Sequence, residues 1–473
     1  MREVTVVTPT GCIGNRGICK EAFEETLDSE KPHCIAVDAG SLDCGPWYLG
    51  HGLPHSPISN IRWDIDVILS EAVPRKIPVV IGSAGGSGAK PNVDLTLRIV
   101  KEVAKKRNLD FRLASIYADI DKEYLIQRIK SGEKIRKVPV SIFGEELLRV
   151  EDVEMCTNIV AMMGMEPLIE ALKRGADVVI AGRAVDSAVI AAYPVMMGFD
   201  PALALHMGDI MECAESALVD VEGVTRRLGP NRISIVGVMR EKHFLLKAGH
   251  PGMICTTSSA CAHGMYERES SLLTEFPNGV LDKRESKFEQ YDEAICRVSG
   301  AKLVEKPYTV LLEGAGLAGW RTITVLGVRN PVMISQIDEI LTEAKRREEE
   351  RFQSEGRFGV YYHVYGKNGV LGDYEPEKGI TSHELGIVVD VVGESQQLAH
   401  EVCEDLALRI AFWRYKGRTT TAGNVAYLFS PNVVDVGEAF TTAIYHQMAL
   451  EDPLELFPMA IESVKEHEEG VRH

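Results

Sequence analysis

The sequence predicts an α/β N-terminal half, with a largely parallel sheet flanked by helices, and an α+β C-terminal domain. The first half alternates short apolar runs with amphipathic helical stretches, a pattern typical of parallel strands joined by crossover helices. In the second half, strand-like runs surround only two long helices. We place the boundary near residue 230, which gives domains 1–230 and 231–473.

The elements of the first half follow from these apolar runs. Short β-branched or apolar runs predict strands at residues 4–7, 34–37, 78–81, 111–117 and 177–181. Apolar residues at helical spacing predict helices at residues 17–27, 63–72, 94–107, 122–131 and 166–174. Because most of the strands end in polar or glycine-rich loops, we expect these loops to meet at one edge of the sheet, where ligands of such folds bind.

The elements of the second half are mixed. Strands are predicted at residues 232–238, 308–313, 322–328, 359–364 and 386–392. The two helices are predicted at residues 333–352 and 395–414, the second with Leu398, Val402, Leu406 and Ile410 on one face.

Composition narrows the classes of protein. The 473 residues carry a net charge of −17, which disfavours binding to phosphate backbones. With 45% hydrophobic residues the chain can bury a core. No apolar run approaches the roughly 18 residues of a membrane helix, and the N-terminus lacks the apolar core of a signal peptide. We therefore expect a cytoplasmic protein that contacts neither nucleic acid nor membrane.

The cysteines and motifs give no sign of a bound cofactor. The ten cysteines are too dilute for a disulfide scaffold and form no C-x-x-C pair. We interpret most of them as reduced thiols in or near the core. The sequence shows no nucleotide, flavin or structural-metal motif, so the metal prediction is none and coenzyme A is expected only as part of a substrate.

The loop after the second predicted strand is the first candidate site. It places Asp38, Ser41 and Asp43 among three glycines. Carboxylates at a strand's carboxyl end can act as general acid or base, and the alternative is that they cap turns and helices. We predict Asp38 or Asp43 as the general base and Ser41 as a substrate ligand.

The glycine-rich loop at residues 82–88 is the second candidate. Gly82, Ser83, Gly85 and Gly86 lie between a strand and a helix, where free N–H groups can bind an anion. The loop is neither a Walker A loop nor a complete G-x-G-x-x-G fingerprint. We predict that it holds a carboxylate or a phosphate of a thioester carrier; the alternative is a flexible connection.

The third candidate follows the strand at residues 177–181. Arg183 can bind a carboxylate through two parallel hydrogen bonds, and Asp186 and Ser187 begin the next helix. Asp186 is a candidate acid, and Ser187 a candidate substrate ligand. The alternative is that Asp186 caps the helix or pairs with Arg183.

Further downstream, helical spacing groups His263, Tyr266 and Glu267 on one face. His263 is therefore a second candidate acid, although a single histidine is often structural. Glu212, after an apolar stretch, could reach the same crevice or lie on the surface.

Read in order, several segments resemble the acyclic terpene utilisation protein A-like family. The strongest match is residues 175–188, followed by 262–267 with 277–282, 313–315 with 319–322, 421–431 and 452–458. The first loops depart from the terpene-pathway branch, which indicates a subgroup with its own substrate. The resemblance implies catabolism of acyl-CoA esters or branched carboxylic acids, and a small separate partner subunit.

Together these features predict a lyase of the hydratase or dehydratase type, acting on a small branched carboxylic acid or its CoA thioester. An acyl or amide hydrolase that uses the same carboxylates is one alternative. A non-catalytic scaffold or acyl-binding subunit is another. The family resemblance and the apolar Phe429, Val433 and Val434 also suggest a homo-oligomer or a complex with a small partner.

Overall fold

The computed structural model describes residues 2–14, 17–139, 141–229, 232–266, 270–379 and 382–465. The chain divides into two compact units, Met1–Gly316 with Thr442–His473 and Leu317–Thr441. The boundary expected near residue 230 lies inside the first unit. The reason is that β9 (Ile235–Arg240) pairs with β1 (Glu3–Thr8) along its whole length, so both sides of that point share one sheet.

A ten-stranded sheet organises the first unit, in the order β14-β15-β10-β9-β1-β2-β3-β7-β4-β22. Its neighbours β1, β2, β3, β7 and β4 run parallel. The flanking strands are antiparallel, so the sheet is mixed rather than largely parallel. The bounds are β2 (Cys34–Asp38), β3 (Val79–Gly82), β4 (Phe111–Ile116), β7 (Val178–Ala181), β10 (Phe244–Ala248), β14 (Lys287–Gln290), β15 (Cys296–Ser299) and β22 (Met459–Val464).

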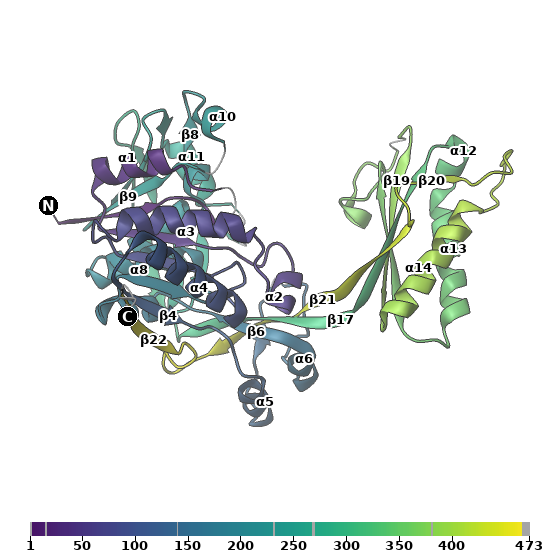
Figure 1. Ribbon diagram of the computed structural model, residues 1–473, viewed down its shortest axis with the longest axis horizontal. Helices are drawn as coiled ribbons and strands as arrows, with labels where there is room; N and C mark the ends of the chain where they lie inside the picture. The colour runs from purple at the N-terminus through teal and green to yellow at the C-terminus, as the bar shows by residue number, and fades with distance from the viewer. Residues whose placement is uncertain are drawn as a thin grey trace, which may run out of the picture. The chain divides into compact units, whose positions relative to one another are not determined.

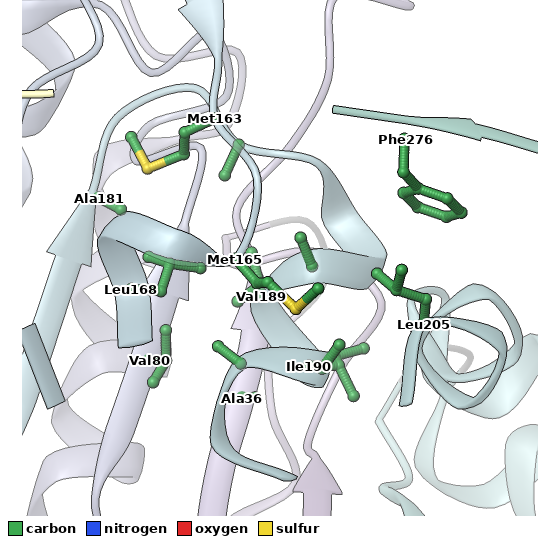
Figure 2. Close-up of a cluster of buried hydrophobic side chains, with 14 of the residues drawn as sticks. Ala36, Val80, Met163, Met165, Leu168, Ala181, Val189, Ile190, Leu205 and Phe276 are labelled. Carbon is green, nitrogen blue, oxygen red and sulfur yellow. The ribbon is translucent and has the colours of Figure 1, made fainter. Parts of the chain in front are cut away.

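Helices cover both faces of the parallel strands (Figure 1). Successive strand residues alternate between two cores, as the pleat requires: Ile35 and Val37 pack on one side, Cys34 and Ala36 on the other. The first face carries α1 (Lys20–Glu30), α3 (Ile58–Ala72) and α4 (Lys90–Arg107). The second carries α7 (Glu166–Lys173), α8 (Asp186–Met196) and α9 (Pro201–Met211). Figure 2 shows Val189 and Ile190 of α8 beside Ala36 and Val80 of the sheet.

The rest of the first unit is built from shorter elements. Helical segments are α2 (Trp47–His51), α5 (Lys122–Lys130), α6 (Val150–Met155), η1 (Ala214–Ala217), α10 (Val224–Leu228) and α11 (Thr257–His263). The remaining strands are β5 (Arg136–Lys137), β6 (Cys156–Met162), β8 (Val219–Asp220), β11 (Met253–Ile254), β12 (Leu273–Phe276), β13 (Gly279–Asp282) and β16 (Lys302–Glu305). β17 (Thr309–Val328) was expected as two strands, but it is continuous, and its first part pairs with β6.

The second unit packs helices on one face of an antiparallel sheet. The second part of β17 pairs with β19 (Leu385–Gly393) and β20 (Val425–Tyr427), and β19 pairs with β18 (Phe358–Tyr365). β21 (Val433–Ala449) is shared between the units. Alternate residues of β19 are buried against α13 (Ile337–Phe352) and α14 (Gln396–Ala411). α12 (Pro331–Ile334) and η2 (Gly372–Tyr374) complete the unit.

The residues behind the oligomer prediction divide between core and surface of the second unit. Val433 belongs to its core, whereas Phe429 and Val434 are exposed. Association with a second copy or a small partner stays a prediction. Across the described residues, no helix combines the length and apolar character that membrane crossing requires.

Candidate functional site

Three of the predicted loops meet at the carboxyl ends of the parallel strands. Asp38, the last residue of β2, lies opposite Gly82 of β3 in the strand register. Arg183, which follows β7, reaches both loops: its Nη1 lies 3.3 Å from the Gly40 carbonyl oxygen and 3.3 Å from the Ser83 Oγ. The three loops that the sequence predicted to converge therefore do lie together at one edge of the sheet.

Close backbone contact holds the loop after β3 against the loop after β7. Gly88 has a φ of +67°, and a Cβ there would lie 2.1 Å from the Arg183 backbone nitrogen. Only glycine fits a left-handed position this close to a neighbouring main chain. The Ser83 Oγ also accepts a hydrogen bond from the Ala184 N–H at 3.3 Å. These contacts fix the position of the Arg183 backbone, from which its side chain extends.

Arg183 is committed to a buried ion pair with Glu313 of β17. The Nε–Oε2 distance is 2.7 Å and the Nη2–Oε1 distance is 3.4 Å, and both side chains are almost fully buried. Burial lowers the pKa of Arg183, but the charges of Glu313 and Asp186 outweigh burial and keep the guanidinium charged. Since Glu313 occupies the fork, Nη1 is the donor group that faces the other loops.

Asp38 is a buried carboxyl group with one unpartnered oxygen. Its Oδ2 accepts a hydrogen bond from the Gly40 N–H at 2.8 Å, and its Oδ1 has no hydrogen-bond partner. Burial first, and the charge of Asp186 second, raise the pKa of Asp38 well above its ordinary value, against the charge of Arg183 and the nearby donors Gly40 N–H and Ser83 hydroxyl. A carboxyl group in this setting keeps its proton to higher pH, as a general acid requires.

The other predicted residues of the first and third loops are less enclosed. Asp43 is exposed, and its N–H donates to the Ser41 Oγ at 3.2 Å. Asp186 lies in the first turn of α8, with its Oδ1 3.6 Å from the Arg183 Nη1. Ser187 packs against Gly208 of α9, and its Oγ is buried without a hydrogen-bond partner.

The glycine-rich loop packs around protein side chains. A Cβ on Gly86, whose φ is +107°, would lie 2.6 Å from the His55 Nδ1. Gly85 lies against Asn92 of α4, whose Nδ2 donates to the Ser87 Oγ at 2.8 Å. The loop therefore packs against His55 and leads into α4, and its predicted role in binding an anion stays a prediction.

His55 contacts Cys12, which lies in the loop after β1. The His55 Nε2 is 3.6 Å from the Cys12 Sγ, and the same sulfur is 3.7 Å from the Ile13 carbonyl oxygen. Burial, and then the charges of Asp38 and Asp186, raise the pKa of the Cys12 thiol. Burial lowers the pKa of His55. Both groups are therefore neutral near pH 7.

A buried carboxylate closes the loop that carries Cys12. Asp64 of α3 accepts hydrogen bonds from the Gly14 and Ile18 N–H groups, both at 2.6 Å. Burial raises the pKa of Asp64 to about 6. Asp64 thus anchors Gly14, two residues after Cys12, and Ile18.

His263 and Tyr266 lie together, as their spacing suggested, but α11 ends at His263 and Tyr266 follows in a turn. Their rings stack with centroids 4.4 Å apart. The Tyr266 Oη lies 2.9 Å from the Cys213 Sγ, and a Cβ on Gly11 would touch the Cys213 backbone at 3.0 Å. This group therefore adjoins the Cys12 loop. Glu267 falls outside the described residues, and Glu212 is buried just after α9.

A cavity of about 170 Å³ has Val185, two residues after Arg183, in its wall. Tyr445 and several apolar side chains also line it, together with the polar side chains of Glu275, Lys306 and Gln447. Burial first, and then the charge of Glu313, raise the pKa of Tyr445. Among the described residues, no group of three or more His, Cys, Asp and Glu side chains is arranged to hold a metal ion.

Three residues of this site went unrecognised as functional in the sequence. Glu313 lies 130 positions after Arg183, and only tertiary structure pairs them. His55 stands alone in a loop, without a partner at recognisable spacing. Cys12 was grouped with the core thiols, although its position after the first strand was a usable signal.

Comparison with known proteins identifies one family. The sequence model described as acyclic terpene utilisation family protein AtuA matches residues 60–420, most of the chain, and confirms the resemblance noted in the sequence. Ser83, Arg183, Asp186 and Glu313 lie within the match, and Asp38 precedes it. No curated protein and no solved structure matches significantly.

Proposed function

We propose that this chain, which belongs to the acyclic terpene utilisation family AtuA, is a lyase that adds or removes water beside the carbonyl group of a small branched carboxylic acid or its thioester. One observation carries the proposal. Asp38 is a buried carboxyl group with a raised pKa and a free oxygen, placed at the strand ends beside a charged arginine. Carboxyl groups in such environments serve as general acids at neutral pH.

Asp186 and Asp38, whose surroundings differ, act as the general base and the general acid. Asp186 is partly exposed and lies next to the Arg183 charge, so it is the base that takes a proton from the carbon beside the carbonyl. Asp38 gives its proton to the departing hydroxyl group, and water leaves as the double bond forms. In the hydration direction each transfer is reversed. The sequence assigned the two roles the other way, and the burial of Asp38 is the reason for the exchange.

Arg183 stabilises negative charge on the substrate carbonyl oxygen. Glu313 accepts from its Nε and Nη2, and the Gly40 carbonyl oxygen and the Ser83 Oγ accept from its Nη1, so the guanidinium acts on the substrate through its charge. A guanidinium held in a buried ion pair needs no rearrangement when charge develops, which is the condition for electrostatic stabilisation of a transition state. The cavity beside Val185 would take the hydrocarbon part, and its volume of about 170 Å³ favours a short chain.

The test is a variant that keeps the shape of Asp38 and removes its acidity. Asp38→Asn should lower kcat by about 100- to 10,000-fold, the usual worth of a positioned acid or base, with little change in KM. The assay follows hydration and proton exchange by NMR in heavy water, with straight and branched 3-hydroxy acids, free and as CoA thioesters. Wild-type kcat should fall as pH rises through the pKa of Asp38, and the variant should lack this fall.

Asp110→Asn is the matched control. Asp110 is exposed and precedes β4, at the amino end of the same parallel strands, so its activity should equal that of the wild type. Normal kcat in a folded Asp38→Asn protein would remove Asp38 from the chemistry. A wild-type protein inactive on every compound of the panel would refute the lyase assignment.

A further inference from the structure

The Cys12–His55 pair has no role in the reaction proposed above. The two side chains come from different loops and meet at 3.6 Å between Sγ and Nε2. Two glycines leave the space that the imidazole ring occupies, because a Cβ on Gly86 or on Gly40 would collide with the ring. Tyr48 packs edge-on against the other side of the ring, with centroids 6.3 Å apart. A thiol facing a positioned imidazole is the arrangement of an activated nucleophile.

The surroundings of the thiol point to a ligand. Asp38 is buried, and its Oδ1 has no hydrogen-bond partner. Cys12 itself is half-buried rather than enclosed in the core. With the Nδ1-protonated tautomer of His55, Nε2 is free to accept the thiol proton. The thiol and the imidazole are in contact, and Asp38 is joined to the residue after Cys12 by the hydrogen bond from the Ile13 N–H to the Asp38 carbonyl oxygen.

We propose that Cys12 is an acyl-accepting nucleophile activated by His55, and that its substrate is a thioester. His55 Nε2 takes the thiol proton as the Cys12 sulfur attacks the thioester carbonyl carbon. The bond from that carbon to the leaving sulfur then breaks, and His55 returns the proton to the leaving thiolate. The products are an acyl group on Cys12 and a free thiol, so no oxidant or further reactant is needed.

A thioester fits this pair better than an ester or an amide. Exchange between two thiols makes one C–S bond and breaks another, and the leaving thiol departs as a stabilised anion. An alcohol or amine is a poorer leaving group and would need stronger protonation.

The proposal deepens the lyase assignment and rests on it only for the step after acylation. An acyl group on Cys12 would be held beside Asp38 and Asp186, where water is added or removed. Acylation itself needs only the thiol and the imidazole. The two hypotheses therefore fail separately: Asp38→Asn should still be acylated while losing turnover, and Cys12→Ser should lose acylation.

The experiment uses the full chain and the acetyl, isobutyryl and crotonyl thioesters of coenzyme A. After quenching in acid, intact-mass and peptide analysis should find one acyl group, on the peptide that contains Cys12. The label should be absent from Cys12→Ser. It should form about 100-fold more slowly in His55→Gln, the lower range for loss of a general base. Cys44→Ser, which removes an exposed thiol of the neighbouring loop, should be labelled like the wild type.

A second measurement does not depend on whether a variant folds. Incubation of the wild type with the thioester should protect Cys12 from iodoacetamide while Cys44 still reacts. Three outcomes would overturn the proposal: no label or protection with any of the thioesters, equal labelling of Cys44 and Cys12, or an unchanged acylation rate in folded His55→Gln. Unlabelled protein with an intact Asp38 effect would leave the lyase assignment standing alone.

Discussion

Each unit contains a buried glutamate paired with an arginine, yet the two pairs sit in different settings. In the first unit Arg183 and Glu313 join a loop at the strand ends to β17, and both side chains are buried. In the second, Arg409 of α14 pairs with Glu348 of α13, and a quarter of the arginine side chain is exposed. Arg183 is surrounded by converging loops, whereas Arg409 is surrounded by helix side chains. Burial of an ion pair alone does not mark a site; the groups around it do.

Each arginine also has an aspartate nearby, and these two aspartates differ in their surroundings. Asp405 lies 2.9 Å from the Arg409 Nη2 and also binds Arg351, so charge at that position is shared by a surface network. Asp186 lies 3.6 Å from the Arg183 Nη1, and beside it the Asp38 Oδ1 has no hydrogen-bond partner. The Glu348 Oε2 also lacks a hydrogen-bond partner, so an unpartnered carboxyl oxygen occurs near both pairs, and the difference lies in the loops that converge on Arg183.

The largest expected effect is that of Glu313→Gln. It removes the charge facing a buried arginine, and breaking a buried ion pair costs about 3–5 kcal/mol. We expect that loss in the free energy of unfolding, measured by urea denaturation at pH 7. Glu305→Gln, an exposed glutamate of β16, is the control and should match the wild type. A Glu313→Gln protein as stable as its control would mean that Arg183 finds another partner.

Arg183→Lys should have the next largest effect. Lysine keeps the charge but loses the planar fork, so it cannot bind Glu313, Gly40 and Ser83 together and its charge is held less precisely at the site. We expect KM to rise about tenfold, equivalent to about 1.4 kcal/mol of binding, with a smaller fall in kcat. Arg409→Lys is the matched change in the other unit. It should leave KM unaltered, and a parallel rise in both variants would point to a general loss of folded protein.

The smallest expected effect is the change with pH in the free energy of unfolding of the second unit. Burial first, and then Asp405, raise the pKa of Glu348 to about 7. Because the folded protein binds this proton more tightly than the unfolded chain, stability should fall between about pH 5 and pH 7 as the proton is lost. Hydrogen exchange of peptides from α13 and α14, followed across this pH range, measures the fall in stability. Glu348→Gln, which cannot ionise, should reduce this slope; an unchanged slope would assign it to other groups.

The sequence was most informative where one short segment determines the outcome. β2, β3 and β7 are buried apolar runs that end at Asp38, Gly82 and Ala181, so their existence and the convergence of their loops could be predicted. A mixed α/β fold with parallel strands at its centre could be predicted too. The antiparallel flanks could not, because strands such as β9 reach the sheet through long-range pairing that no local pattern encodes.

The missing parts of the site have the same physical origin. Glu313 lies in β17, which was expected to end there, because Gly314, Gly316 and Gly319 interrupt the apolar pattern of what is a continuous strand. The position of His55 could not be predicted because it depends on Gly86, whose lack of a side chain makes room for the imidazole ring. Contacts of this kind depend on where backbones pass one another, and sequence spacing does not record that.

The contact between Gly88 and Arg183 also constrains motion. A main chain with no space for a methyl group against its neighbour cannot slide past it. The loops after β3 and β7 therefore form a single rigid body, and slow opening of one requires opening of the other. The loop after β2 is held in the same way, because a Cβ on Gly40 would lie 2.6 Å from the Gly86 Cα. All three loops are therefore tied together at their bases, and the exposed Asp43 and Cys44 lie beyond these contacts.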